Sequence, residues 1–290
     1  MKKIKTQSFI SYRVICSIWQ LLGFSNTAIK RMEVRNKIAK KVKKRYSKSL
    51  EEINYREPKT QSTAKTIWVC WLQGEQPAPK LVKKCLSSIR KHSNYDDMIF
   101  ITKNNYANFT NIPAYIVDKW NNGNISNAHF SDILRTAILA ENGGIWIDAT
   151  VYLLDKIPDY LKNSKLFLFN YEDNDSSFKY NNWFIIAQKN NPVMLTMRDL
   201  LYIYWKKEKK AYDYFIWQLL FSIVIKKYDY DKNIFYIPNS LGHMIHKKCN
   251  EDFNQSYMNV IKKICPIQKL SYKIDSSNPN SFLNHIINEQ

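Results

Sequence analysis

The stretch Ser131–Thr150, SDILRTAILAENGGIWIDAT, predicts a helix, a sharp stop and a buried strand that ends on a carboxylate. Asp132 and Arg135 are three positions apart, so they share one face of the helix, and the apolar residues between and after them supply a stripe for the core. A double glycine closes the helix, because glycine readily adopts the left-handed conformation found at helix ends. Asp148 then falls at the end of the apolar run IWI. Ligands of open α/β sheets bind at the carboxyl ends of strands, so this stretch predicts a binding site.

Strand and helix patterns alternate on both sides of this stretch. The apolar runs Ile67–Leu72 and Met98–Thr102 predict strands, and residues 81–89 between them repeat apolar side chains at helical spacing. Leu166–Phe169 and Trp183–Ala187 predict two more strands. Such alternation indicates an α/β fold with a mostly parallel sheet and helices on both faces.

Three parts of the chain differ in pattern. Residues 1–65 predict a basic, helical N-terminal extension and a polar linker, with an amphipathic helix over about 27–50. Residues 66–190 carry the alternating strands and helices of the predicted core. Residues 191–290 are mainly helical in pattern, with two amphipathic candidates, Val193–Lys207 and Tyr212–Lys227, that we expect to form a helical subdomain or lid.

The net charge of +19 is concentrated near the N-terminus, where residues 1–50 hold 14 Lys or Arg and the single acid Glu33. Such a segment suits a solvated arm, a nucleic-acid contact or attraction to anionic lipid headgroups. Within it, the apolar run Phe9–Phe24 is short for a membrane span, and Arg13 makes a signal peptide a poor fit. We expect a helix that lies in the membrane interface; the alternative is a helix packed on the protein itself.

The cysteines are five in number and scattered, and none forms a C-x-x-C pair. This pattern indicates neither a disulfide framework nor a zinc site, so we expect reduced thiols in a cytoplasmic protein.

The first predicted strand is followed by the turn Trp71-Leu72-Gln73-Gly74, which has an indole for stacking and a glycine that lets the backbone approach a ligand. Arg135 can meet a phosphate with two parallel hydrogen bonds. Carboxylates such as Asp132 and Asp148 can bind hydroxyl groups or a metal ion. Together these residues offer the surfaces that a nucleotide sugar requires.

Four segments resemble glycosyltransferase family 32, the sugar-binding-region family with a D-x-D motif, and in particular its branch of capsular polysaccharide synthesis proteins. They are IWVCWLQGEQPAP, AHFSDILRTAILAENGGIWIDATV, NNWFIIAQKNNP and, weakly, AYDYFIW, and they extend over about residues 66–245. The spacings S-D-x-x-R and G-G-x-x-x-D are also similar to the glucosyltransferase domains of large clostridial toxins. The resemblance implies a GT-A-like fold.

The resemblance also implies roles for individual residues. Trp71 would stack on uracil, Asp132 would hold sugar or ribose hydroxyls, and Arg135 would approach the diphosphate. Asp132, Arg135 and Asp148 form the implied catalytic set. The implied nucleotide-sugar site comprises Trp71, Gln73, Gly74, Asp132, Arg135 and Asp148.

The implied metal site departs from the family pattern. Asp148 matches the first aspartate of D-x-D, but the second position is Thr150, a weak neutral ligand. Asp148 could still hold Mn²⁺ or Mg²⁺ together with water and the diphosphate, because such ions are often shared with substrate phosphates.

Other residues have both a functional and a structural interpretation. His243 could reach the diphosphate or an acceptor, or pack against the protein, and Asp213 could bind acceptor hydroxyls or cap a helix. His129 is more typical of a structural neighbour than of a base. Trp71 could be core filler, and Asp132 with Arg135 a surface ion pair.

Taken together, the motifs and the resemblance predict a hexosyltransferase that uses a nucleotide sugar, in particular a UDP-sugar. The resemblance implies that the sugar is transferred with retention. The expected acceptor is a growing capsular or cell-surface glycan at the inner face of the cytoplasmic membrane, to which the basic N-terminal region would bind. Two alternatives are a basic nucleic-acid-binding protein and a sugar-binding relative without turnover. The first is disfavoured because the basic cluster lies outside the predicted catalytic domain and no RNA-binding aromatic motif is present.

Overall fold

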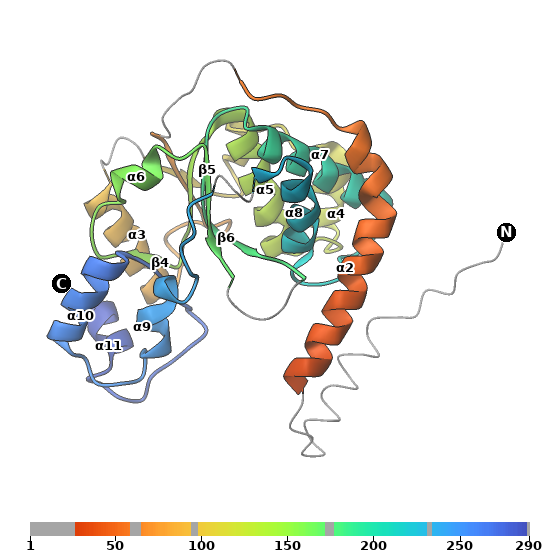
Figure 1. Cartoon of the computed structure of the whole chain (residues 1–290). Helices are drawn as coiled ribbons and strands as arrows, with labels where there is room; N and C mark the ends of the chain where they lie inside the picture. The colour runs from red at the N-terminus through yellow and green to blue at the C-terminus, as the bar shows by residue number, and fades with distance from the viewer. Residues whose placement is uncertain (1–26, 59–64, 94–97, 172–176, 231–233, 289–290) are drawn as a thin grey trace.

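A five-stranded sheet runs through the centre of the computed structural model, which describes residues 27–58, 65–93, 98–171, 177–230 and 234–288 (Figure 1). Its order is β2-β1-β3-β6-β5, and the strands are β1 (Ile67–Cys70), β2 (Met98–Ile101), β3 (Gly144–Asp148), β5 (Leu166–Asn170) and β6 (Tyr180–Ala187). β1 pairs in parallel with β2 and β3, and β6 runs against the other four. The predicted mostly parallel sheet is confirmed.

Helices cover both faces of the sheet, because alternate residues of its central strands point to opposite sides. In β1, Trp68 and Cys70 belong to one hydrophobic cluster, whereas Ile67 and Val69 belong to another. The first cluster also contains residues of α2 (Thr27–Glu52), α4 (Ala114–Asn121), α5 (Asn127–Asn142), α7 (Pro192–Lys207) and α8 (Ile216–Lys227). The second contains residues of α3 (Lys80–His92) and the short α6 (Asp159–Lys162), and beyond α3 pack α9 (Met244–Lys247), α10 (Gln255–Ile264) and α11 (Phe282–Asn288).

The double glycine fixes the junction between α5 and β3. Gly143 and Gly144 have φ angles of 68° and 111°, where side chains are strained. A Cβ on Gly144 would lie 2.5 Å from the carbonyl oxygen of Thr66, so only glycine lets β3 start this close to the chain that leads into β1. The predicted helix stop is confirmed, and it sets where Asp148 falls at the far end of the strand.

A second, two-stranded sheet lies beside the first and was not predicted. β4 (Val151–Leu153) follows the end of β3 almost at once and pairs antiparallel with β7 (Ile267–Lys269), with Val151 opposite Lys269. This register brings the C-terminal region of the chain to the carboxyl end of β3.

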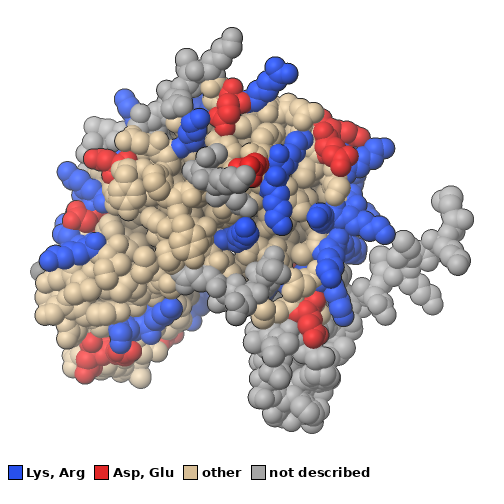
Figure 2. Space-filling model, in the orientation of Figure 1, with Lys and Arg blue, Asp and Glu red and all other residues tan. Residues whose placement is uncertain are grey.

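The predicted amphipathic helix near the N-terminus is α2, which lies along one side of the molecule against α7 and α8 (Figure 1). Its buried residues Ile38, Val42, Tyr46 and Leu50 recur every four positions, as one face of a helix requires. Figure 2 shows Lys and Arg side chains along the α2 side of the surface. The helix is therefore apolar toward the core and basic toward solvent.

Two expectations concern residues that the structure describes only in part. The apolar run Phe9–Phe24 lies outside the described residues, and within them no helix combines the length and apolarity that a membrane span needs. The four described cysteines are free thiols, and Cys16 lies outside the described residues.

Candidate functional site

A pocket of about 580 Å³ opens at the carboxyl ends of β1 and β3. Cys70 at the end of β1 pairs with Asp148 at the end of β3, so Trp71, the next residue after β1, lies beside the predicted carboxylate. The volume is in the range of small-molecule sites, roughly 300–1,000 Å³. Most of the predicted residues line this pocket, namely Trp71, Gln73, Asp132, Arg135, Asp148, Thr150 and His243.

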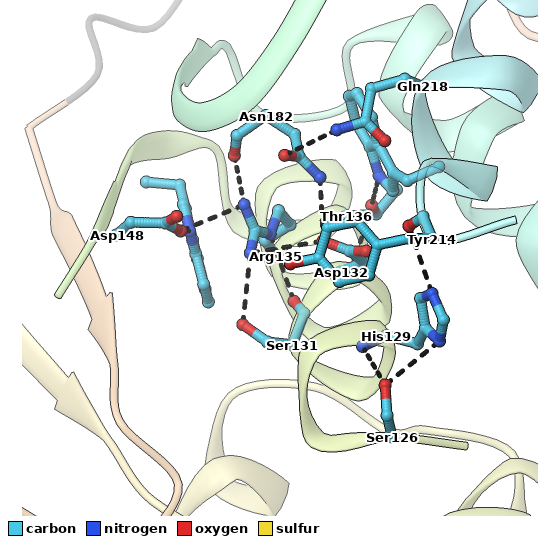
Figure 3. Close-up of polar contacts among 12 residues, drawn as sticks. Ser126, His129, Ser131, Asp132, Arg135, Thr136, Asp148, Asn182, Tyr214 and Gln218 are labelled. Carbon is cyan, nitrogen blue, oxygen red and sulfur yellow. Dashed lines mark hydrogen bonds and ion pairs between the residues drawn. The ribbon is translucent and has the colours of Figure 1, made fainter. Parts of the chain in front are cut away.

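Arg135 lies at the floor of the pocket, held between two carboxylates (Figure 3). Its Nη1 is 3.1 Å from Oδ1 of Asp148, and its Nη2 is 3.3 Å from Oδ1 of Asp132. Nη1 also donates to the carbonyl of Asn182, and the guanidinium lies 5.1 Å from the centre of the Trp146 ring. With only 5% of its surface exposed, Arg135 is not part of a surface ion pair.

Asp148 accepts hydrogen bonds on both of its oxygens. Oδ1 accepts from Nε1 of Trp146 at 3.1 Å besides its contact with Arg135, and Oδ2 accepts from Nζ of Lys269 at 2.8 Å. Burial alone would raise the pKa of this carboxyl, but the charges of Arg135 and Lys269 outweigh burial, and the pKa lies below the usual value. Asp148 is therefore ionised at neutral pH.

Asp132 has the opposite shift. Burial raises its pKa from the usual 3.8 to about 6, although Arg135 acts in the other direction. Its Oδ1 accepts a hydrogen bond of 2.8 Å from Nδ2 of Asn182, whose own Oδ1 accepts from Gln218 at 3.2 Å. The two carboxyls on either side of Arg135 thus titrate at different pH.

The aromatic side of the pocket is formed by Trp71 and Tyr272. Their ring centres are 5.3 Å apart in an edge-to-face arrangement, and both rings line the pocket. Trp71 is only partly buried and Tyr272 is 41% exposed, so a flat ligand could reach an aromatic surface here. Trp71 is not simply core filler.

The pocket does not include every predicted residue. Gly74 has a φ of 87° and donates its N–H to the carbonyl of Trp71, so it closes the turn but does not line the pocket. Asp213 lies outside the lining, and its Oδ1 accepts from the backbone N–H of Phe215 at 2.8 Å, just before α8. His129 also lies outside, with Nε2 3.3 Å from the carbonyl oxygen of Tyr214.

Two lining residues have pKa values that limit their chemistry. Burial lowers the pKa of His243 to about 4, so its imidazole is neutral, and its Nδ1 lies 2.9 Å from the carbonyl oxygen of Asn239. Burial raises the pKa of the Cys70 thiol to about 12, which makes it a poor nucleophile.

Several lining residues were missed by sequence reasoning: Asn182, Tyr214, Gln218, Lys269 and Tyr272. Asn182 lies in NNWFIIAQKNNP, one of the segments that carried the family resemblance. As a polar residue directly before the predicted strand Trp183–Ala187, it could have been proposed as a site residue. One indirect signal pointed to Lys269. Because Thr150 is neutral, Asp148 is the single negative charge of the motif, and one lysine from elsewhere in the chain can balance it.

Comparison with protein families gives one match. The model for the family described as "Capsular polysaccharide synthesis protein" matches residues 18–286. The chain belongs to this family. The match confirms the predicted relationship and extends well beyond the segments at about 66–245 that carried the resemblance. No curated protein matches the chain.

Two solved structures illustrate what this capsular polysaccharide synthesis protein is similar to in shape. The PaToxG glycosyltransferase shares 15% sequence identity over 87% of this chain and 95% of that one, with a TM-score of 0.41. The WbbM bifunctional glycosyltransferase shares 10% identity over 82% of this chain and 52% of that one, with a TM-score of 0.41.

The implied divalent cation does not fit the arrangement of this family member. Three donors, from Arg135, Trp146 and Lys269, already bind the carboxylate of Asp148. Nζ of Lys269 also lies 2.6 Å from Oγ1 of Thr150, so an ammonium group bridges the two positions of the predicted motif. Within the described residues, no group of three His, Cys, Asp or Glu side chains is arranged to hold a metal ion.

Proposed function

We propose that this protein is a GT-A-like glycosyltransferase that takes a hexose or related sugar from a nucleotide sugar, in particular a UDP-sugar. One observation carries the proposal: a buried arginine held between two carboxylates at the floor of an open pocket, at the carboxyl end of a parallel strand. Membership of the capsular polysaccharide synthesis family supports a glycan product.

The pocket offers a separate surface for each part of such a donor. Trp71 and Tyr272 provide rings for the base, and Asp132 provides a carboxylate for sugar or ribose hydroxyls. Arg135 and Lys269 provide positive charge for the diphosphate. The N–H groups of Arg135 already have protein partners. A direct hydrogen bond to a phosphate therefore requires Nη2 to exchange one of its two contacts, which are 3.3 Å to Oδ1 of Asp132 and 3.4 Å to Oγ of Ser131.

Transfer with retention would need no nucleophile from the protein. The bond between the anomeric carbon and the diphosphate oxygen breaks, and its electron pair stays on the diphosphate. The acceptor hydroxyl oxygen bonds to the anomeric carbon from the same face, and its proton passes to the departing diphosphate. The protein contributes positioning and positive charge beneath the leaving group.

The proposed acceptor is a growing capsular or cell-surface glycan at the inner face of the cytoplasmic membrane. The basic outer face of α2 supports a peripheral contact with anionic lipid. Flotation with anionic vesicles should carry the full chain and fail for a variant in which the exposed Lys37, Lys40 and Lys44 are replaced by glutamate, because this variant keeps the buried face of α2. Equal flotation of the two proteins would rule out a membrane role for the outer face of α2.

The donor proposal is tested by calorimetry with UDP, GDP and CMP sugars, with and without Mn²⁺. We expect one of them to bind, and Asp148→Asn to weaken its binding at least tenfold because Arg135 and Lys269 lose the carboxylate that holds both cations in position. A matched control is Asp155→Asn, since Asp155 is a half-exposed carboxylate that pairs with Lys262 outside the pocket. If no nucleotide sugar binds, the proposed function is wrong.

A further inference from the structure

The ammonium group of Lys269 lies between the first and last residues of the motif-like triplet Asp148-Ala149-Thr150. Its Nζ lies 2.8 Å from Oδ2 of Asp148 and 2.6 Å from Oγ1 of Thr150. These two residues are the first and last of the motif-like triplet. One ammonium group therefore contacts both positions that would otherwise share a metal ion.

The backbone holds this lysine in place. Lys269 is the last residue of β7, opposite Val151 of β4, and the N–H of Leu270 donates to the carbonyl of Thr150 at 2.8 Å. Thr150 immediately precedes β4. The pairing of β4 with β7 therefore places Lys269 next to Thr150, where its side chain makes the contact described above. The pairing of β4 with β7 thus determines where the Lys269 side chain starts, and this side chain is directed into the pocket and not out into solvent.

Lys269 is also the more accessible of the two cations that contact Asp148. Its side chain is 21% exposed, against 7% for Arg135, and it lines the pocket. The lining cations Arg135, Lys269 and Lys273 outnumber the lining carboxylates Asp132 and Asp148. A negatively charged diphosphate would meet a net positive surface without an added metal ion.

Thr150 and Lys269 complement each other chemically. A second carboxylate at position 150 would favour a divalent ion, whereas a neutral hydroxyl leaves Asp148 as the sole anion of the motif. A single ammonium balances that one charge, and its third N–H can donate to a phosphate oxygen. Bringing a divalent cation to the same oxygens would force it against the lysine.

We propose that Lys269 replaces the divalent cation of a D-x-D glycosyltransferase, so that this protein binds the donor's diphosphate and transfers its sugar without a metal ion. This inference rests on the proposed function. During transfer, Lys269 stabilises the negative charge that collects on the departing diphosphate as its bond to the anomeric carbon breaks.

The test is calorimetry of the full chain with UDP and GDP as probes, after EDTA treatment and again with Mn²⁺ added. We expect EDTA-treated protein to bind one of them, with an affinity that Mn²⁺ changes less than twofold. Lys269→Met should weaken this binding about 10- to 100-fold, the range for losing a charged hydrogen bond. Lys269→Arg should keep most of it.

The control is Lys262→Met, which removes the same charge from a half-exposed lysine that pairs with Asp155 outside the pocket. A reciprocal variant, Thr150→Asp with Lys269→Met, recreates D-x-D and should bind the nucleotide more tightly when Mn²⁺ is present. Should Lys269→Met fail to fold, the EDTA comparison on the unaltered chain still decides the question.

The possible outcomes separate this inference from the proposed function. Binding that disappears with EDTA and returns with Mn²⁺ overturns the role of Lys269 and leaves the donor site intact. Unchanged binding by folded Lys269→Met overturns it as well. If neither nucleotide binds under any condition, the inference is wrong, whereas the proposed function is wrong only if no nucleotide sugar binds either.

Discussion

Two regions meet at the pocket, and they differ in how they are built. The α5–β3 unit supplies Asp132, Arg135 and Asp148 from one stretch of chain, and Arg135 is 5% exposed. The segment that begins with β7 supplies Lys269 and Tyr272, and Tyr272 is 41% exposed. The first region supplies the buried charged groups at the bottom of the pocket, and the second supplies more exposed side chains that a ligand would contact. Substitutions in the first should therefore affect folding and binding together, and those in the second chiefly binding.

The largest effect should come from Arg135→Ala. It leaves Asp132 and Asp148 without their shared cation, and losing one partner of a buried ion pair costs about 3–5 kcal/mol. We expect a lower Tm, together with a loss of transfer of about 100-fold or more in the protein that stays folded. Arg135→Lys should recover part of the stability. Near-normal transfer by Arg135→Ala would remove the arginine from the mechanism.

Gly144→Ala should be next, and its effect should be on folding. The φ of 111° and the 2.5 Å approach to the carbonyl oxygen of Thr66 predict a loss of about 3 kcal/mol in the free energy of unfolding, measured in urea. Gly123→Ala is the control, because Gly123 has a φ of 72° but nothing within 4 Å of its added Cβ. Equal losses in the two variants would show that close packing at the start of β3 is unimportant.

Tyr272→Ala should have a smaller effect, confined to binding. Losing one stacking surface should weaken the binding of the nucleotide sugar about tenfold, with little change in Tm. Tyr236→Ala is the control, since Tyr236 is 68% exposed and does not line the pocket. A large drop in the Tm of Tyr272→Ala would contradict the contrast between the two regions.

Asp132→Asn should change the pH dependence of stability. The folded pKa of about 6 exceeds the usual 3.8, so the folded state keeps a proton that the unfolded state has lost. Stability from this group is therefore full below pH 3.8 and falls as pH rises to about 6. The variant should remove this fall, which thermal unfolding from pH 4 to pH 7 would measure. An unchanged profile would place the titration elsewhere.

Much of the first region could be predicted from sequence because its rules are local. Helical spacing predicted that Asp132 and Arg135 share a face, and the double glycine predicted where α5 ends. The turn after β1 and the carboxylate at the end of β3 were each predicted to bind a ligand, and the register of the two strands brings Trp71 beside Asp148. The burial of Arg135 could not be predicted in this way, because it depends on contacts with Asn182 and Trp146 as well as on the residue's own helix.

The alternation of strands and helices, the helix stop and the carboxylate at the end of β3 could be predicted, because each follows from neighbours a few positions apart in the chain. Which cations contact that carboxylate depends on contacts between distant segments. Lys269 is 119 residues from Thr150, and its approach depends on the pairing of β4 with β7. No local sequence pattern predicts the contact between Lys269 and Asp148, because a lysine at the end of a short strand is common and its partner comes from a strand far away in the sequence.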